Sequence, residues 1–112
     1  MSLPIEGSVA PTIVYNITTQ VEKSIATKWI DWMLDIHIPE IIGTGNFIFH
    51  QVLKLSGIDE NESETYAIQF YAATKKDLDD YLRIHAPAMN KKSHELWGDR
   101  IVSFSTTMQV IN

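Results

Sequence analysis

The sequence contains no cysteine. This absence excludes thiolate nucleophiles, redox-active disulfides and zinc sites with cysteine ligands, and it fits a protein of the reducing cytosol. No apolar run approaches the roughly 20 residues of a membrane-spanning helix. The N-terminus also lacks the basic start and the long apolar stretch of a signal peptide. We therefore expect a cytoplasmic protein that does not interact with membranes.

Basic residues are scarce as well: 9 Lys and Arg stand against 14 Asp and Glu, which gives a net charge of −5. Such a chain has no overall attraction for nucleic acids. The sequence has no phosphate-binding glycine loop, no nucleophile elbow and no RNA-binding aromatic signature. No two of its four histidines have the close spacing of a helical zinc site. We therefore predict no metal, no cofactor and no nucleic-acid partner.

The length of 112 residues is that of one domain. A chain of this size buries about 65% of its unfolded surface and needs no disulfide or metal to fold. Residues 1–11 are predicted to be a disordered leader or a remnant of protein expression, and residues 12–112 are predicted to form a single domain.

The first half of the domain has the pattern of a strand followed by a helix. Side chains alternate over residues 12–18, which indicates a strand. Thr19 and Glu22 have the spacing of a capping box, which predicts that a helix begins there. Pro39 is expected to end or kink this helix, because it has no N–H and clashes with a carbonyl of the preceding turn. The apolar stripe of the helix is predicted to consist of Ile25, Trp29, Trp32, Met33 and Ile36.

Two further strands are predicted over residues 46–55 and 64–72, joined by a polar turn that favours a hairpin. One face of the first of these strands is expected to carry Phe47, Phe49, Leu53 and Leu55. One face of the other is expected to carry Tyr66, Ile68 and Phe70.

Thr74 and Asp77 are spaced to cap a second helix. A short third helix is predicted over residues 89–97, ended by Gly98, and a last strand over residues 100–111. The apolar stripe of the second helix is expected to consist of Leu78, Tyr81, Leu82 and His85.

In chain order these elements form the β-α-β-β-α-β pattern of an α+β, ferredoxin-like fold. Four antiparallel strands would carry both helices on one face of the sheet. The other face is half apolar in either strand register, and an open face of that kind is usually covered. A second copy related by a twofold axis is the simplest cover. We therefore predict a homodimer that forms through the open sheet face, which is a dimeric α/β barrel.

Several short motifs carry a resemblance to known families. They are Ile13-Val14-Tyr15-Asn16, Trp29-x-x-Trp32-Met33, His37-Ile38-Pro39-Glu40, Tyr66-Ala67-Ile68-Gln69, Tyr81-Leu82, His85-Ala86-Pro87 and Gly98-Asp99-Arg100. Over residues 12–111 the chain resembles a small bacterial family with a ferredoxin-like dimeric α/β-barrel fold. The resemblance implies this fold and supplies no activity.

A looser resemblance is to the ether-degradation accessory-type dimeric barrels, in which a helical Trp is followed shortly by His-x-Pro. Trp32, His37 and Pro39 match that form, and His85 and Pro87 repeat its second part. Cofactor-free monooxygenases share the barrel, but no motif of this chain transfers their activity, because a fold does not determine a function.

His37 and His85 are the first candidate site residues, and each has two interpretations. An imidazole with an ordinary pKa near 6.5 suits acid–base catalysis at neutral pH. Each histidine would also stand at the C-terminal end of a helix, where it binds the last carbonyl groups while the proline ends the helix. In this fold the two helix ends lie at opposite ends of the protomer, so we expect that the two histidines do not form a pair within one chain.

Four other residues are candidates for binding a ligand or assisting catalysis. Tyr66 would donate a hydrogen bond to a ligand, or else lie half-buried with its hydroxyl at a water edge. Gln69 would add a polar group on the same strand. Trp32 would line an aromatic pocket or belong to the core. Arg100 would hold an anionic ligand or pair with its neighbour Asp99.

Two functions remain open from the sequence. The first is a dimeric domain that binds a small, apolar molecule or a partner and has no catalytic motif. The second is a cofactor-free enzyme, similar to a monooxygenase or an isomerase, that acts on a small apolar or aromatic compound. In the second case His37 would be the acid–base residue, with Tyr66 or Trp32 positioning the substrate. The sequence alone does not decide whether the protein is an enzyme.

Overall fold

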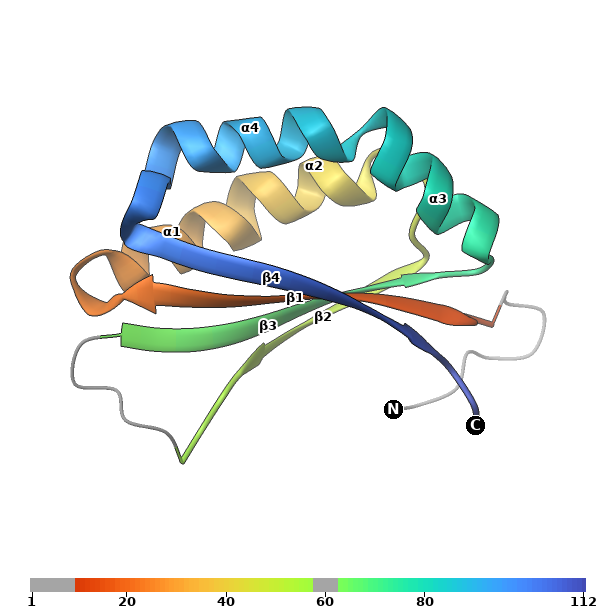
Figure 1. The fold of residues 1–112 in the computed structure, drawn as a ribbon, viewed down its shortest axis with the longest axis horizontal. Coiled ribbons are helices and arrows are strands. Elements are labelled where there is room, and N and C mark those ends of the chain that lie inside the picture. Colours follow the sequence, from red (N-terminus) through yellow and green to blue (C-terminus); the bar gives the residue numbers. More distant parts are fainter. Residues whose placement is uncertain (1–9, 58–62) are drawn as a thin grey trace.

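A computed structural model describes residues 10–57 and 63–112 and contains a four-stranded antiparallel sheet with helices over one face (Figure 1). The strands are β1 (Ile13–Glu22), β2 (Phe49–Lys54), β3 (Ser63–Ala72) and β4 (Ile101–Gln109). The predicted α+β, ferredoxin-like fold is confirmed. The predicted leader lies largely outside the described residues, and Pro11 at its end is buried.

Two helical arms cross the same face of the sheet (Figure 1). The first arm runs over residues 23–42 and consists of η1 (Lys23–Ile25), α1 (Ala26–Trp32), the π-turn η2 (Met33–His37) and α2 (Ile38–Ile42). The second arm consists of α3 (Lys75–Ile84) and α4 (Ala86–Trp97), and the short η3 (Gly98–Arg100) leads into β4. Within the described residues no helix is long and apolar enough to cross a membrane.

The strand order is β2-β3-β1-β4, so the longest strands, β1 and β3, lie in the centre. The register pairs Tyr15 with Phe70 on one side of β1 and with Thr107 of β4 on the other. Because directly opposite residues share a face, this register assigns each strand residue to the helix-covered face or to the open face.

The first strand is longer than predicted, and the expected capping box at Thr19 is wrong. β1 continues to Glu22, and its side chains keep alternating, with Thr19 and Val21 buried. The hydroxyl oxygens of Thr19 and Ser103 of β4 share a hydrogen bond of 2.8 Å. Pairing with strands on both sides therefore outweighs the local capping signal, since a side chain engaged across the sheet does not cap a helix.

The first helical arm does not end at Pro39, which was one of the two outcomes expected there. The backbone N–H of Ile38 donates to the carbonyl of Met33, five residues back, which makes a π-turn directly before the proline. Pro39 then occupies the first turn of α2, where its missing N–H costs little. The wider turn also changes which residues face inward: Ile36, predicted to be core, is 50% exposed, whereas His37 is buried.

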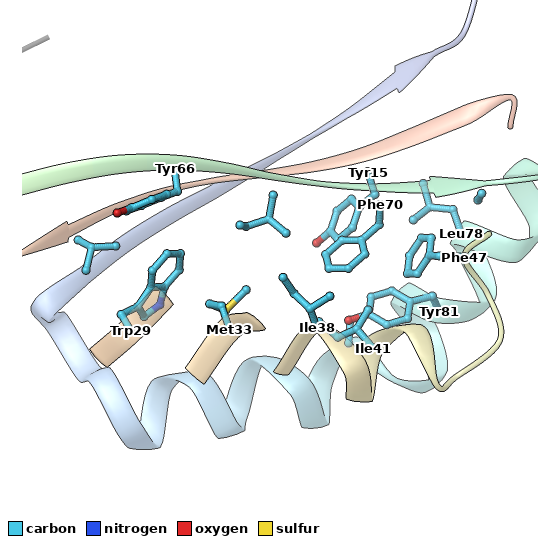
Figure 2. Close-up of a cluster of buried hydrophobic side chains, with 14 of the residues drawn as sticks. Tyr15, Trp29, Met33, Ile38, Ile41, Phe47, Tyr66, Phe70, Leu78 and Tyr81 are labelled. Carbon is cyan, nitrogen blue, oxygen red and sulfur yellow. The ribbon is translucent and has the colours of Figure 1, made fainter. Parts of the chain in front are cut away.

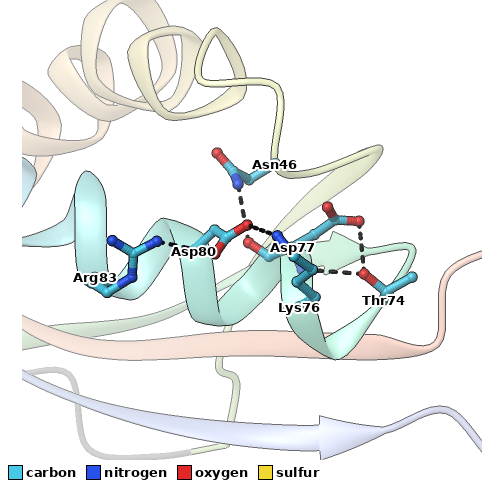
Figure 3. A network of polar contacts seen from close by, with 6 residues as sticks. All are labelled: Asn46, Thr74, Lys76, Asp77, Asp80 and Arg83. Atoms are coloured by element: carbon cyan, nitrogen blue, oxygen red, sulfur yellow. Dashed lines mark hydrogen bonds and ion pairs between the residues drawn. The ribbon is translucent and has the colours of Figure 1, made fainter.

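The second arm begins as predicted and then continues further than predicted. The Thr74 hydroxyl accepts a hydrogen bond from the backbone N–H of Asp77 (3.1 Å) and so caps α3 (Figure 3). The side-chain amide of Asn46 donates to the Asp77 carbonyl and ties the chain before β2 to the same turn. After α3, Pro87 again falls in a first helical turn, so α4 starts at Ala86 rather than near Met89.

Gly98 ends α4, as predicted. Its φ of 57° lies in the left-handed region that favours glycine, and nothing lies close to the position of a Cβ there. The backbone then turns from the helix layer back to the sheet edge, where β4 begins.

The core lies between the sheet and the helical arms (Figure 2). Its largest fully buried side chains are Trp29, Phe70, Ile41, Ile68, Leu78 and Val21. Phe47 belongs to this core and packs against Phe70 and Tyr81, with ring centroids 5.2 and 4.8 Å apart. The prediction that Phe47 shares a strand face with Phe49 is wrong, because a bend at Ile48 interrupts the alternation before β2 begins.

The open face of the sheet is half apolar, as predicted. Asn16 and Gln69 lie opposite each other near its centre, and large apolar side chains of the two edge strands surround them. Phe104 is 63% exposed and Phe49 is 47% exposed. The large exposed apolar side chains of this face are Phe49, Leu53, Val102, Phe104 and Met108.

Candidate functional site

A cleft of about 360 Å³ lies between the helix-covered face of β1 and β4 and the two helical arms. It exists because α4 buries only Ala86, at its N-terminus, and does not pack closely onto the sheet along its length. The cleft is partly open to solvent. This is the place in the molecule where the sheet and the helices leave room for a ligand.

The walls of the cleft are about half apolar. Trp29 and Met33 contribute from the first helical arm, and Figure 2 shows both facing the sheet, in line with Ile38 and Ile41. The apolar residues that line the cleft from the strands and from α2 are Ile17, Ile41, Ile68, Phe70, Ile101 and Phe104. On this side a ligand would contact the hydrophobic core.

Polar groups reach the cleft from three directions. Tyr15 of β1 and Tyr81 of α3 line it, and neither hydroxyl has a hydrogen-bond partner among the described residues. Burial and the neighbouring Tyr15 raise the pKa of the Tyr81 phenol, which therefore stays protonated. The remaining polar side chains are Thr19, Ser103 and Ser105 from the sheet, His37 from the π-turn, and Asn90, Ser93 and His94 from α4.

The lining carries no carboxylate, ammonium or guanidinium group. All of the described residues around the cleft are apolar, hydroxyl, amide or imidazole side chains, or glycine. In residues 10–57 and 63–112 no three His, Asp or Glu side chains are grouped so that they could hold a metal ion. The chemistry available in the cleft is therefore hydrogen bonding by neutral groups.

His37 is the most distinctive polar group of the cleft. The side chain is 6% exposed, and Nδ1 is fully enclosed without a hydrogen-bond partner in the described part of the chain. Burial lowers the pKa of His37 to about 4, although the neighbouring Glu40 carboxylate partly opposes this effect. His37 is therefore neutral at neutral pH. The expected role of His37 as a helix C-cap is wrong, because the arm continues through α2 to Ile42.

The imidazole of His37 is held by a cluster of aromatic rings. It stacks on Trp32 with ring centroids 4.3 Å apart and an interplanar angle of 19°. Trp97 of α4 meets Trp32 edge-on at 5.7 Å and so connects the two helical arms. All three tryptophans of the chain thus lie in or beside the cleft.

An ion pair outside the cleft also joins the arms. Lys92 of α4 donates to the Glu40 carboxylate of α2, and this hydrogen bond lowers the pKa of Glu40. Both side chains are substantially exposed, so the pair contributes little to stability. Neither Lys92 nor Glu40 lines the cleft.

The sequence-predicted catalytic pair, His37 and Tyr66, is not brought together. Tyr66 is buried against Trp29 at 5.3 Å, and its hydroxyl donates to Glu64 Oε1 at 3.0 Å. Glu64 in turn pairs with Lys54 at 2.9 Å. Tyr66 therefore packs the core at one end of the sheet and does not line the cleft.

The predicted ligand-binding residues are spread over the molecule. Trp32 stacks on the imidazole ring of His37 and does not itself line the cleft. His85 lies at the junction of α3 and α4, 6.2 Å from the Tyr81 ring, and it does not cap an isolated helix end because α4 follows at once. Within the described residues, the cleft brings His37 together with His94 and not with His85.

Gln69 and Arg100 lie away from the cleft. Gln69 is on the open face, where its side-chain oxygen accepts a hydrogen bond from the Tyr71 hydroxyl at 2.8 Å. Arg100 donates to the carbonyls of Leu96 and Trp97 and lies over the Trp97 ring. Arg100 and Asp99 both line a separate surface hollow of about 420 Å³.

Sequence reasoning missed most of the polar residues that line the cleft. Asn90, Ser93 and His94 have the i, i+3, i+4 spacing of one helix face. That spacing was a usable signal: a polar stripe on a helix that carries few apolar residues. Ser103 and Ser105 alternate on the helix-covered face of β4 and had no comparable signal, since serine is common on strands that face water.

The comparison with protein families gives one match over nearly the whole chain. The family model described as "Domain of unknown function (DUF4286)" matches residues 12–111. No curated protein has a sequence that matches this one.

Solved structures match the fold. A dimeric ferredoxin-like protein from an uncultured marine organism has a TM-score of 0.70 at 8% identity, over 91% of this chain and 97% of that chain. An ethyl tert-butyl ether d (ethd) family protein from Bacillus halodurans has a TM-score of 0.67 at 14% identity, over 88% and 99%. A Bacillus cereus protein provisionally assigned as an antibiotic biosynthesis monooxygenase has a TM-score of 0.62 at 12% identity, over 92% of this chain and 96% of that chain. At these identities the likeness establishes the shared fold alone.

Proposed function

Because the chain belongs to the DUF4286 family, whose function is unknown, we propose its function from the cleft itself: it binds a small molecule between the sheet and the helical arms, as one half of a homodimer. The observation that carries this proposal is a cleft of about 360 Å³ in which apolar side chains of the core face neutral polar groups, among them the buried imidazole of His37. Ligand sites combine apolar walls with polar groups that fix the orientation of the ligand.

The volume of the cleft limits the size of the ligand. An engineered protein cavity of about 150 Å³ holds benzene. A cleft of about 360 Å³ therefore suits a bicyclic compound or a single ring with a short side chain. The partly open mouth gives such a molecule a route in.

Binding is favoured over catalysis by the state of His37. A general base works best when its pKa is near the operating pH, whereas burial lowers the pKa of His37 to about 4. In the described part of the chain no serine or threonine of the cleft is hydrogen-bonded to a histidine, so a nucleophile activated by an imidazole is not supported.

The test of ligand binding uses a blocked cleft and a matched control on the same helix. Ser93→Phe would place a ring in the cleft from α4, whereas Lys91→Phe would place the same ring on the exposed side of that helix. We expect native mass spectrometry to detect a co-purified small molecule on the wild type and on Lys91→Phe, and at least a tenfold loss on Ser93→Phe. Equal retention by both variants would contradict a site in this cleft.

The alternative is a cofactor-free enzyme, similar to a monooxygenase or an isomerase, with His37 as the acid–base residue. Support for it comes from the imidazole in the cleft and from the fold shared with the Bacillus cereus protein. It requires that the molecule found in the cleft be converted, and that His37→Phe abolish conversion while leaving its binding largely intact. A ligand recovered unchanged after long incubation with the protein would argue against this alternative.

The homodimer is proposed to form through the open sheet face. The half-apolar character of that face supports it, as does the dimeric ferredoxin-like protein with the same fold. The cleft lies mainly on the opposite, helix-covered side of the sheet. Ligand binding and dimer formation therefore use largely different surfaces of the protomer, and Phe104 of the edge strand β4 borders both.

A further inference from the structure

We propose that the cleft selects neutral ligands that carry a hydroxyl group, and that His37 is the specificity-determining residue that hydrogen-bonds to it. This inference rests on the proposed function and adds the chemical class of the ligand. It follows from three features: the absence of charge in the lining, the hydrogen-bonding state of His37, and the rigid support of its ring.

The lining disfavours charged ligands of either sign. A carboxylate entering the cleft would find no lysine or arginine, and an amine would find no aspartate or glutamate, among the described residues that line it. A buried charge without a partner of opposite sign is strongly unfavourable. The nearest charges to His37, on Glu40 and Lys92, already neutralise each other across the helical arms. The cleft therefore suits a neutral ligand.

The hydrogen-bonding state of His37 narrows the class further. Nδ1 is enclosed and has no partner among the described residues, as is also true of the indole N–H groups of Trp29 and Trp97. Nε2 is not enclosed in this way, so it is the nitrogen that a ligand in the cleft would meet. A neutral imidazole has one nitrogen that accepts a hydrogen bond and one that donates. A ligand hydroxyl matches Nε2 in either tautomer, because it both donates and accepts. An ether matches only a donating nitrogen.

The support of the imidazole gives this interaction its selectivity. Trp32 stacks on the ring on one side, and Trp97 braces Trp32 from α4. The π-turn sets the inward direction of the side chain, since Ile36 points outward and His37 inward. A hydrogen-bonding group held in this way discriminates by geometry as well as by polarity, because the ring cannot turn away from a mismatched ligand.

The test compares three probes that share a para-ethylphenyl group and differ in one polar substituent: 4-ethylphenol, 4-ethylanisole and the 4-ethylbenzoate anion. Their affinities for the wild-type protein are measured by isothermal titration calorimetry at pH 7. We expect 4-ethylphenol to bind about tenfold more tightly than 4-ethylanisole, the ratio that one neutral hydrogen bond supplies. The benzoate is expected to bind most weakly.

Two variants separate the role of His37 from a general effect on folding. His37→Phe keeps an aromatic ring for the stack on Trp32 but removes both nitrogens, and we expect its phenol-to-anisole ratio to fall to about one. His37→Gln keeps a donor and an acceptor, and we expect it to retain a preference for the phenol. Unfolding curves of both variants verify that each one is folded before its affinities are compared.

The outcomes distinguish this inference from the function on which it rests. Equal binding of all three probes by the wild type would overturn the inference and leave a ligand-binding cleft intact. Binding of the phenol with an undiminished preference in His37→Phe would assign selectivity to another group, such as Ser105 or Tyr81, and would also overturn it. If no probe binds to the wild type at millimolar concentration, the inference and the proposed small-molecule cleft both fail.

Discussion

The buried imidazole of His37 is expected to make the stability of the fold depend on pH. Burial lowers its pKa from 6.5 to about 4, while Glu40 and Lys92 act in opposite directions. As the pH falls below 6.5, the unfolded chain takes up a proton here that the folded chain takes up only near pH 4. The free energy of unfolding should therefore fall over this window, by about 3 kcal/mol in total, as measured by urea denaturation at several pH values.

The variant His37→Phe isolates this contribution, because the other titratable groups remain in place. Between pH 6.5 and 4 its stability should decline less steeply than that of the wild type, and His37→Gln should behave in the same way. All curves must be recorded at one protein concentration, since the proposed dimer would make apparent stability depend on concentration. Parallel pH profiles for the wild type and both variants would mean that His37 is protonated as easily in the folded state as in the unfolded one.

At the scale of single residues, the sequence predicted only part of the cleft lining. His37 was identified from its position in a His-x-Pro motif, and it does line the cleft. Tyr66, Gln69 and Arg100 were chosen for the chemistry of their side chains, and each proves to be engaged elsewhere. Hydrogen-bond partners come from strands and helices distant in sequence, so a residue's type indicates what it can bind and not whether it is already occupied.

At the scale of elements, the π-turn behaves as an insertion of one residue into an α-helix. Met33, His37, Ile38 and Ile41 face inward, at intervals of 4, 5 and 8 residues. Deleting the exposed Asp35 would shorten these intervals to the 3, 4 and 7 of a regular helix, so the same side chains would stay inside. We predict that this deletion variant folds with a free energy of unfolding within about 1 kcal/mol of the wild type, measured by urea denaturation.

A matched deletion in a regular helix controls for the loss of a residue. Asp79 is exposed on α3, between the buried side chains of Leu78 and Tyr81. Its removal would rotate the rest of α3 by about 100° and turn Tyr81 away from the core. This variant should lose several kcal/mol or fail to fold. If the two deletions are equally damaging, the π-turn is an integral part of the core rather than an inserted residue.

The cap of α3 gives a second prediction at this scale. Thr74 Oγ1 accepts from the Asp77 N–H and is itself exposed, so its loss leaves no cavity. Thr74→Ala should lower the free energy of unfolding by about 1 kcal/mol. Thr74→Ser should keep most of the stabilisation that the cap provides, because serine also carries a hydroxyl group. Chemical denaturation of the three proteins measures both differences. An unchanged Thr74→Ala variant would show that the helix end is satisfied by water.

The elements themselves were largely predictable, and the exceptions have physical causes. Strands and helices follow from the alternation along β3 and from the stripe around Trp29 and Met33, which local periodicity reports directly. The π-turn was not predictable, because its wider turn breaks the 3.6-residue period at Ile36. The extension of β1 past Thr19 was missed because partners in β3 and β4, far away in sequence, decide where a central strand ends.

For the whole molecule, the cleft depends on an arrangement that no segment encodes alone. Its lining comes from β1, β3, β4 and both helical arms. Fold class and the half-apolar open face were read from the order and the patterning of the elements. The gap below α4 arises instead from how little apolar surface that helix presents, which becomes visible only when Asn90 and Ser93 are placed opposite the sheet.

The open face of the sheet supplies the last prediction, which concerns assembly. Phe49 and Met108 stand on opposite edge strands, 47% and 41% exposed, so lysine at both positions would charge this face without disturbing the core of one protomer. We expect the wild type to sediment as a dimer at micromolar concentration and Phe49→Lys/Met108→Lys to sediment as a monomer. The control, Leu34→Lys/Leu96→Lys, changes two equally exposed apolar residues of the helical arms and should remain dimeric. A monomeric wild type would contradict the proposed homodimer. Dissociation of the control alone would indicate an interface on the helical side of the protomer, near the mouth of the cleft.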